Sequence, residues 1–252
     1  MFKLTNQEKL LIFSFVLRIE KVAIKILNKT KLDDKTQRLL LREISSMQKL
    51  HHQNIIRLYE VIHTSTRLYI CMEYAPDGEL FTKINESGKI SEVESRIIFS
   101  QIISAVNHMH SHNIIHRDIK AENIFFANFF PIIVKIGDFG FSIEATVTKQ
   151  LNTYCGSPPY AAPELFRDDT YLGIYVDIWA LGVLLYFMVT GLMPFKAETV
   201  GKLKRVILSG EYVIPGYVSE SCQLLIRGIL KPAPADRYNI NEIMESAWLD
   251  NV

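Results

Sequence analysis

HRDIKAEN, residues 116–123, gathers a histidine, an arginine, an aspartate, a lysine and an asparagine into eight positions, and the apolar run IFF follows directly. Charged side chains are costly to bury unless each finds a partner. A solvated loop, in turn, does not need so many chemically different polar groups. The stretch therefore predicts a place where a reaction occurs or an ion is bound, and the surrounding sequence narrows the choice.

Further motifs flank this loop in a fixed order. Upstream, VAIK (22–25) places Lys25 in a β-branched run typical of a strand, and Glu43 lies midway along the helix predicted next. Downstream come KIGDFG (135–140), with an acidic residue in a tight turn, and GSPPYAAPE (156–164). Each motif alone is weak, because strand lysines and Asp-x-Gly turns are common. The ordered set is far more specific than an accidental match in a surface loop.

Together these motifs resemble those of the eukaryotic protein kinases, over about residues 21–252. The resemblance implies a bilobal α+β kinase fold occupying the whole chain, 1–252, and a serine/threonine protein kinase that uses ATP and Mg²⁺. The expected small, β-rich lobe covers 1–73 and is incomplete at its start. The expected hinge is 74–77, and the larger helical lobe is 78–252.

By this resemblance, four charged side chains perform the transfer. Phosphoryl transfer depends on positioning and charge neutralisation more than on covalent catalysis. Lys25 is expected to hold the α- and β-phosphates, and an ion pair with Glu43 is expected to orient it. Asp118 would act as the base toward the substrate hydroxyl, and Lys120 would steady the γ-phosphate. A lysine at position 120 resembles the serine/threonine class.

The same resemblance assigns the nucleotide contacts. Asn123 and Asp138 offer the hard oxygen ligands that Mg²⁺ prefers. Met72 occupies the gatekeeper position at the back of the nucleotide site. The residues expected around adenine are Ala23, Met72, Glu73, Ala75 and Phe125, with Glu73 and Ala75 contributing backbone groups.

Buried side chains are expected to support the site. By resemblance, a stack of apolar and aromatic side chains links the two lobes, and Asp177 anchors its base. The members of this stack are Met47, Leu58, His116 and Phe139. Glu164 is expected to pair with Arg237.

Regulation is expected at Thr153, which lies between DFG and APE, where these kinases are often phosphorylated. A phosphate there adds a charge of about −2, and Arg117 is its expected partner. The alternative is an unmodified loop threonine. Ser157 is expected instead to brace Asp118 and Lys120.

The branch of the family is indicated by KAEN (120–123) in place of the commoner KPEN. With LNTYCGSPPYAAPELF, it resembles the AMP-activated-kinase-related group, most nearly the NIM-type (new inducer of mitosis) kinase and then the microtubule-affinity-regulating kinases. The implied partners are proteins with serine or threonine acceptors and an upstream activating kinase. Glu79 and Glu122 would face the N-terminal side of the substrate and favour basic residues there.

The glycine-rich loop of the family is missing. Counted back from Lys25, its glycines should fall near Lys3, Thr5 and Glu8. Glycine matters in such a loop because the backbone must approach the phosphates closely. Three explanations stay open: a truncated or misjoined start, a variant with weakened ATP binding, or a pseudokinase that serves as an interaction scaffold. We favour the first, because every polar catalytic residue is retained.

Composition limits the partners and the location. A net charge of +1 gives no reason to expect nucleic acid or a membrane surface as a partner. Three widely spaced cysteines argue against a disulfide framework and for a reducing, cytoplasmic location. The apolar run at 10–17 lacks a small-residue cleavage site, which disfavours a signal peptide. The uncharged run at 178–195 is long enough to span a bilayer, but the resemblance assigns it to the buried central helix of the large lobe.

Residue periodicity predicts the elements around these motifs. The strands are expected at 21–27, 55–62 and 67–74, and the helices at 33–50, 92–112, 177–190, 198–209, 219–230 and 240–248. The alternating histidines of HMHSHNIIH (108–116) raise the possibility of Zn²⁺. The end of a surface helix is the preferred interpretation, because no cysteine or carboxylate pair completes a site.

Overall fold

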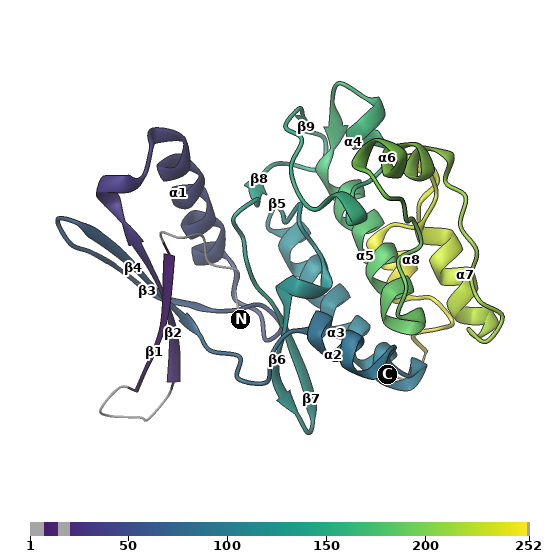
Figure 1. Cartoon of the computed structure of the whole chain (residues 1–252), viewed down its shortest axis with the longest axis horizontal. Coiled ribbons are helices and arrows are strands. Elements are labelled where there is room, and N and C mark those ends of the chain that lie inside the picture. Colours follow the sequence, from purple (N-terminus) through teal and green to yellow (C-terminus); the bar gives the residue numbers. More distant parts are fainter. Residues whose placement is uncertain (1–7, 15–20, 251–252) are drawn as a thin grey trace.

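The computed structural model describes residues 8–14 and 21–250, which form two lobes (Figure 1). The small lobe holds the N-terminal sheet and one helix, and the large lobe is mostly helical. The main elements of the small lobe are β1 (Glu8–Ser14), β2 (Lys21–Asn28), α1 (Asp34–Lys49), β3 (Leu58–His63) and β4 (Arg67–Glu73). The α+β class predicted from the sequence is confirmed.

The small lobe is built on a four-stranded antiparallel sheet with the order β1-β2-β4-β3. Helix α1 begins where the side chain of Asp33 accepts a hydrogen bond from the Thr36 amide, at 2.7 Å. Asp34 in its first turn and Lys49 in its last complement the helix dipole. The predicted strand at 21–27 and helix at 33–50 therefore lie where the sequence placed them.

Strand β3 is shorter than predicted, because residues 55–57 make other contacts. The Ile56 amide donates to the carbonyl of Ile136, at 2.9 Å, and the Ile136 amide donates to the carbonyl of Asn54, at 2.8 Å. Ile136 belongs to the large lobe. The segment before β3 thus ties the two lobes together instead of extending the small sheet.

The hinge is held to the large lobe by two backbone hydrogen bonds. The Asp77 amide donates to the Phe126 carbonyl, at 3.0 Å, and the Phe126 amide donates to the Gly78 carbonyl, at 2.8 Å. Gly78 has a φ of 85°, a conformation that glycine adopts without steric penalty. This turn fixes where the chain passes from one lobe to the other.

The large lobe packs its helices around one apolar helix (Figure 1). The helices are α2 (Leu80–Ser87), α3 (Glu92–Ser111), α4 (Glu164–Arg167), α5 (Gly173–Thr190), α6 (Val200–Ser209), α7 (Glu220–Ile229) and α8 (Ile240–Met244). By length and composition α5 could cross a membrane, yet 89% of it is buried inside the protein. It is the central core helix, as the sequence resemblance implied.

Short strands frame the loops of the large lobe. They are β5 (Ile114–Ile115), β6 (Ile124–Phe129), β7 (Ile132–Ile136), β8 (Ile143–Glu144), β9 (Gln150–Leu151) and β10 (Tyr171–Leu172). The loop 116–123 runs between β5 and β6, and the loop 137–142 follows β7. Since β6 pairs with β7 and β5 with β8, the two loops leave neighbouring strand ends and lie next to each other.

Helix α8 ends earlier than the predicted 240–248. A capping box fixes its start, since Asn239 accepts from the Glu242 amide and Glu242 accepts from the Asn239 amide. Beyond its end, Trp248 is fully buried and its ring lies 6.0 Å from that of Phe99. The apolar residue that suggested a longer helix is therefore buried from a turn.

The apolar run at 10–17 is described only in part. Residues up to Ser14 belong to β1, which pairs with β2 from Glu8↔Leu27 to Ser14↔Lys21. Of the predicted glycine positions, 3 and 5 lie outside the described residues, and Glu8 begins β1.

Candidate active site

The loop between β5 and β6 holds Asp118 among polar partners. Its Oδ2 lies 2.6 Å from Nζ of Lys120, and its Oδ1 accepts a hydrogen bond from the Ser157 hydroxyl, at 2.9 Å. Lys120 also donates to the Ser157 hydroxyl oxygen, at 2.8 Å. Asp118 is only 4% exposed, so these contacts compensate a carboxylate that burial would otherwise penalise. The predicted bracing role of Ser157 agrees with these contacts.

Asp177 on α5 determines the path of this loop. Its carboxylate accepts hydrogen bonds from the amides of His116, at 2.9 Å, and Arg117, at 2.8 Å. Arg117 has a φ of 66°, which costs a non-glycine residue about 1–2 kcal/mol. The two hydrogen bonds offset that strain and turn the chain so that Asp118 points toward Lys120.

His110, at the end of α3, completes the anchor from the other side. Its Nε2 lies 2.9 Å from the carboxylate of Asp177. Burial alone would raise the pKa of Asp177, but the hydrogen bond from His110, the electrostatic interaction with His110 and His116, and the hydrogen bond from the His116 amide hold that pKa below its usual value. Asp177 therefore stays ionised in a fully buried position.

The DFG segment lies directly against the catalytic loop. His116 Nε2 donates to the carbonyl of Gly137, at 3.2 Å, and the Gly137 amide donates to the carbonyl of Asn123, at 2.9 Å. The ring of Phe139 meets the ring of His116 edge to face, with centroids 5.0 Å apart. These contacts bring Asp138 and Asn123 to the same side of the molecule.

The predicted ion pair of Lys25 on β2 and Glu43 on α1 is present within the small lobe. Nζ of Lys25 lies 3.3 and 3.4 Å from the two carboxylate oxygens of Glu43, which is 6% exposed. A Cβ built on Gly140 would lie 3.2 Å from Oδ1 of Asp138 and 3.9 Å from Oε2 of Glu43. Since both carboxylates surround Gly140, the Lys25–Glu43 pair and Asp138 converge in one place.

Two side-chain oxygen atoms near Gly140, one from Asn123 and one from Asp138, suit a divalent metal ion. The amide nitrogen of Asn123 donates to the carbonyl and carboxylate of Asp118, at 2.9 and 3.2 Å, so its side-chain oxygen stays available. Asp138, with a φ of 58°, accepts from the Gly140 amide through Oδ1, at 3.2 Å. Its other carboxylate oxygen, Oδ2, makes no hydrogen bond or ion pair with the described residues and is available too. This donor set fits Mg²⁺, which prefers carboxylate and carbonyl oxygens.

The predicted adenine-binding residues lie on both sides of the hinge. Ala23 of β2 is paired with Met72 of β4, and both are buried. Phe125 is buried on β6, where its ring would contact a Cβ built on Gly137. The Glu73 amide donates to the Arg57 carbonyl, at 2.9 Å, so Glu73 can offer adenine only its backbone carbonyl. Ala75, partly buried, follows two residues after the end of β4.

The predicted stack between the lobes is largely buried. Met47 of α1 is 3% exposed, and His116 and Phe139 are fully buried. Leu58, at the start of β3, is partly buried and packs against the same core. The base of the stack is fixed by Asp177 through the His116 amide, as the resemblance implied.

Arg117 reaches the segment of Thr153 through a residue that the sequence did not single out. Its Nε donates to the Phe141 carbonyl, at 2.8 Å, and its Nη1 lies 3.4 Å from the hydroxyl of Tyr171. That hydroxyl donates to the carbonyl of Thr153, at 2.7 Å. Thr153 itself is exposed. The side chain of Tyr171 thus connects Arg117 to the backbone of Thr153, the expected phosphorylation site.

The predicted pair of Glu164 and Arg237 is buried and bidentate. Nη1 and Nη2 of Arg237 each lie 2.7 Å from one carboxylate oxygen of Glu164. Arg237 also donates to the carbonyls of Lys231, Tyr175 and Pro232, at 2.7, 2.9 and 3.2 Å. The pair fastens the segment after GSPPY to the loop before α8.

The histidines of HMHSHNIIH serve different structural purposes. His110 binds Asp177, whereas the rings of His108 and His112 face each other with centroids 4.3 Å apart at the end of α3. Within residues 8–14 and 21–250, no three side chains of metal-ligating type form a group. The sequence alone did not distinguish His110 from its neighbours, because only the fold brings α5 against α3.

Comparison with known proteins agrees with this geometry. A family model described as "Protein kinase domain" matches residues 16–249. The chain is 45% identical over 92% of its length to "Probable serine/threonine-protein kinase MARK-A" of Dictyostelium discoideum. It is 44% identical to "Serine/threonine-protein kinase SIK2" of Gallus gallus over 90% of its length, and to a "Serine/threonine-protein kinase SIK3 homolog" of Danio rerio over 91%.

The matched region is only part of these relatives. The chain spans 22%, 28% and 19% of their respective lengths. The residues that match the family model contain the ion pair of Lys25 and Glu43, the loop of Asp118 and the DFG segment. With these elements in place and the family model matched over 16–249, the chain belongs to the protein kinase family.

Proposed function

We propose that this domain transfers the γ-phosphoryl group of ATP to serine and threonine hydroxyls of proteins. The observation that supports this most directly is the carboxylate of Asp118, held between Lys120 and Ser157 beside the DFG segment. The similarity to serine/threonine-protein kinases of the MARK and SIK types supports the same class of acceptor.

Each side chain has a task that its geometry allows. Asp118 accepts the proton of the attacking hydroxyl, and Lys120, 2.6 Å away, places a positive charge beside the transferred group. Lys25, oriented by Glu43, binds the α- and β-phosphates. Asn123 and Asp138 would hold Mg²⁺, which neutralises phosphate charge when bound.

An assay on the purified chain tests this proposal. Transfer of label from [γ-³²P]ATP to a generic serine peptide, together with thermal stabilisation by Mg-ATP, is the expected result. The alternative, an interaction scaffold, is favoured by the absence of glycine at positions 3, 5 and 8. A folded chain that shows neither transfer nor stabilisation would support the scaffold.

Phosphorylation of Thr153 by an upstream kinase is expected to raise kcat/KM on the order of tenfold, because the added charge forms hydrogen bonds near Arg117. Arg117 already contacts Tyr171, which binds the Thr153 carbonyl. The measurement is activity before and after treatment with the activating kinase, with phosphorylation followed by mass spectrometry. Thr153→Ala should abolish the activation, whereas Thr148→Ala, exposed in the same segment, should preserve it. Equal activation of both variants would contradict the assignment.

A preference for basic residues on the N-terminal side of the acceptor is expected to depend on Glu122. Burial raises the pKa of Glu122, and nearby Asp118 and Glu79 raise it further, although Lys120 opposes them. Its Oε2 is buried and has no hydrogen-bond partner within the described residues. Glu122 as a whole is only partly buried, and its negative charge would attract an arginine of the substrate. Glu122→Gln should raise KM for an arginine-containing peptide on the order of tenfold and leave kcat nearly unchanged.

The preference should also weaken at mildly acidic pH. A raised pKa means that Glu122 binds a proton at a higher pH than an ordinary glutamate, and its protonated form no longer pairs with arginine. KM for the arginine peptide should therefore rise as pH falls, while KM for a matched glutamine peptide should change less. The same pH response for both peptides would contradict this role.

We also propose that the chain belongs to the AMP-activated-kinase-related group and functions in a reducing, cytoplasmic compartment. The MARK and SIK relatives support the group, and closeness to the NIM-type kinase stays a prediction. Cys71, Cys155 and Cys222 are all free thiols, which fits a reducing location.

A further inference from the structure

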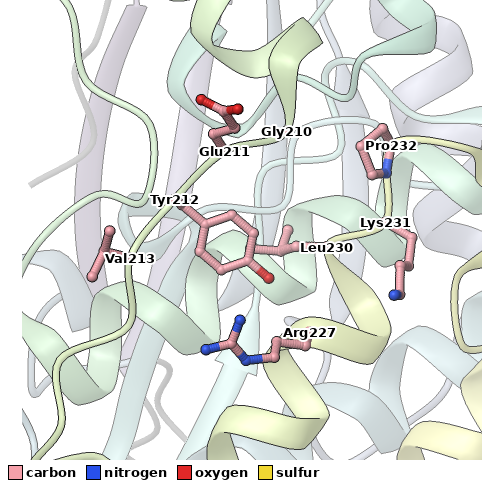
Figure 2. Close-up of a pocket in the computed structure, with 8 residues that line it drawn as sticks. All are labelled: Gly210, Glu211, Tyr212, Val213, Arg227, Leu230, Lys231 and Pro232. Atoms are coloured by element: carbon pink, nitrogen blue, oxygen red, sulfur yellow. The ribbon is translucent and has the colours of Figure 1, made fainter.

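A pocket of about 470 Å³ lies on the large lobe, between the loop that follows α6 and the C-terminal end of α7 (Figure 2). Its lining is formed by Gly210, Glu211, Tyr212, Val213, Arg227, Leu230, Lys231 and Pro232. Helix α7 lies at the far end of the large lobe from the small lobe (Figure 1). The pocket therefore shares no residue with the site of Asp118.

The apolar floor of the pocket is held in place by the core. The ring of Tyr212 lies 5.6 Å from that of Phe195 and 6.2 Å from that of Tyr186, both edge to face. Leu230 is 2% exposed. The hydroxyl of Tyr186 donates to the carbonyl of Val213, at 2.7 Å, which fixes the adjacent loop. A ligand would therefore meet a preformed surface.

Gly210 lets the loop come close enough to form one wall. It has a φ of 67°, and a Cβ at this position would collide with the ring of Pro232. The loop can approach Pro232 only because no side chain intervenes. The pocket thus depends on backbone geometry that a larger residue would disturb.

Three hydrogen-bond donors of the pocket have no hydrogen-bond or ion-pair partner among the residues that the structure describes. No acidic side chain of the described residues forms an ion pair with Arg227 or Lys231, and both side chains are exposed. The hydroxyl of Tyr212 likewise makes no hydrogen bond within residues 8–14 and 21–250, although the ring is half-buried. Burial raises the pKa of Tyr212 to about 12 in spite of the opposing charge of Arg227, so the hydroxyl keeps its proton and can donate.

The acidic and the basic side chains of the pocket lie on opposite sides of its apolar floor. Figure 2 shows Tyr212 and Leu230 between Glu211 on one side and Arg227 on the other. Val213, at 83% exposure, extends the apolar surface outward. A ligand that matches this arrangement needs an apolar group over Tyr212 and Leu230 and an anionic group toward Arg227 and Lys231.

We propose that this pocket is a docking site for a peptide segment of a partner protein, in which an aliphatic side chain lies beside an aspartate or glutamate. The aliphatic side chain covers the floor, and the carboxylate accepts hydrogen bonds from Arg227, Lys231 and the Tyr212 hydroxyl. A free inorganic anion would use the donors but leave the ring of Tyr212 and the side chain of Val213 in contact with solvent. A volume of about 470 Å³ is in the range of ligand-binding clefts, and the pocket is open to solvent, so a peptide segment can lie across it.

Phage display of random 12-residue peptides on the purified chain tests this docking site. We expect the enriched peptides to carry Leu, Ile or Val within three positions of Asp or Glu. Their affinity, measured by fluorescence polarisation, should fall at least tenfold in the double variant Arg227→Glu/Lys231→Glu. Tyr212→Phe, which removes only the hydroxyl, should weaken binding by a smaller factor.

The matched control is Lys196→Glu/Arg205→Glu, which makes the same charge change on exposed residues of the same lobe outside the pocket. It should bind the peptides like the unmodified chain. Unchanged thermal melting and unchanged transfer to a short generic peptide would show that each variant is folded. Because binding is measured without ATP, its outcome is independent of catalysis.

Three results would overturn the proposal. The first is a selection that yields no peptide sensitive to Arg227→Glu/Lys231→Glu. The second is displacement of the peptides by millimolar inorganic phosphate together with equal binding of peptides without an aliphatic residue, which would indicate a simple anion site. The third is self-association of the chain through this face, detected by analytical ultracentrifugation and abolished by the double variant.

Discussion

Asp118→Asn is expected to lower kcat about 10²–10⁴-fold, because asparagine cannot accept the proton of the substrate hydroxyl. The amide is nearly isosteric with the carboxylate: its oxygen can accept the hydrogen bond from Lys120, and its NH2 group, in place of the oxygen that binds Ser157, can donate to the Ser157 hydroxyl. The fold and the ATP contacts of Lys25 should therefore persist. The measurement is steady-state kinetics with a serine peptide, alongside Mg-ATP affinity from thermal shift.

Two controls make this result specific. Ser157→Ala removes one partner of Asp118 but leaves the carboxylate, so its effect on kcat should be much smaller. Unchanged ATP affinity in Asp118→Asn would separate loss of the base from loss of the nucleotide site. Transfer that continues at the original rate in Asp118→Asn would show that another group removes the proton.

Arg237→Met is expected to destabilise the domain by about 3–5 kcal/mol, the cost of leaving one partner of a buried ion pair without its counter-charge. Glu164 is 2% exposed and would lose both of its 2.7 Å contacts. The carbonyls of Lys231, Tyr175 and Pro232 would also lose a donor. For a chain of this size, Tm should fall by roughly 6–20 °C, measurable by calorimetry or circular dichroism.

The exposed pair of Arg167 and Asp168 supplies a matched control. Its atoms are 2.8 Å apart, but half of the Arg167 side chain is in contact with solvent. Arg167→Met should therefore change stability by less than about 1 kcal/mol. The double variant Glu164→Leu/Arg237→Met should be more stable than Arg237→Met, since it removes the uncompensated charge. Equal losses of stability in Arg167→Met and Arg237→Met would show that burial does not determine how much an ion pair contributes to stability.

The motifs predicted the centre of the site because the chemistry of phosphoryl transfer limits which residue types can serve. Lys25 and Glu43 are 18 residues apart, yet their contact was predictable from the ordered motif set. The same holds for Ser157, which contacts Asp118 across 39 residues. In each case a required charge or hydroxyl marked the position.

The supporting contacts were less predictable, because they depend on which surfaces the fold brings together. His110 binds Asp177 across 67 residues, and its neighbours in HMHSH are the same residue type. Tyr171, which joins Arg117 to the Thr153 carbonyl, looks like any apolar residue before a helix. The pocket beside Tyr212 likewise results from the approach of two segments that share no sequence pattern.

The anchoring of residues 116 and 117 by Asp177 separates two parts of the machinery. Asp118, the proposed proton acceptor, follows two residues that are hydrogen-bonded to the buried helix α5, whereas Lys25, the proposed phosphate contact, lies in the small sheet. Alterations near β1 should thus tune nucleotide affinity without displacing the acceptor. Substitutions at the N-terminal edge of such an enzyme can therefore accumulate during evolution while the proton-transfer site stays intact.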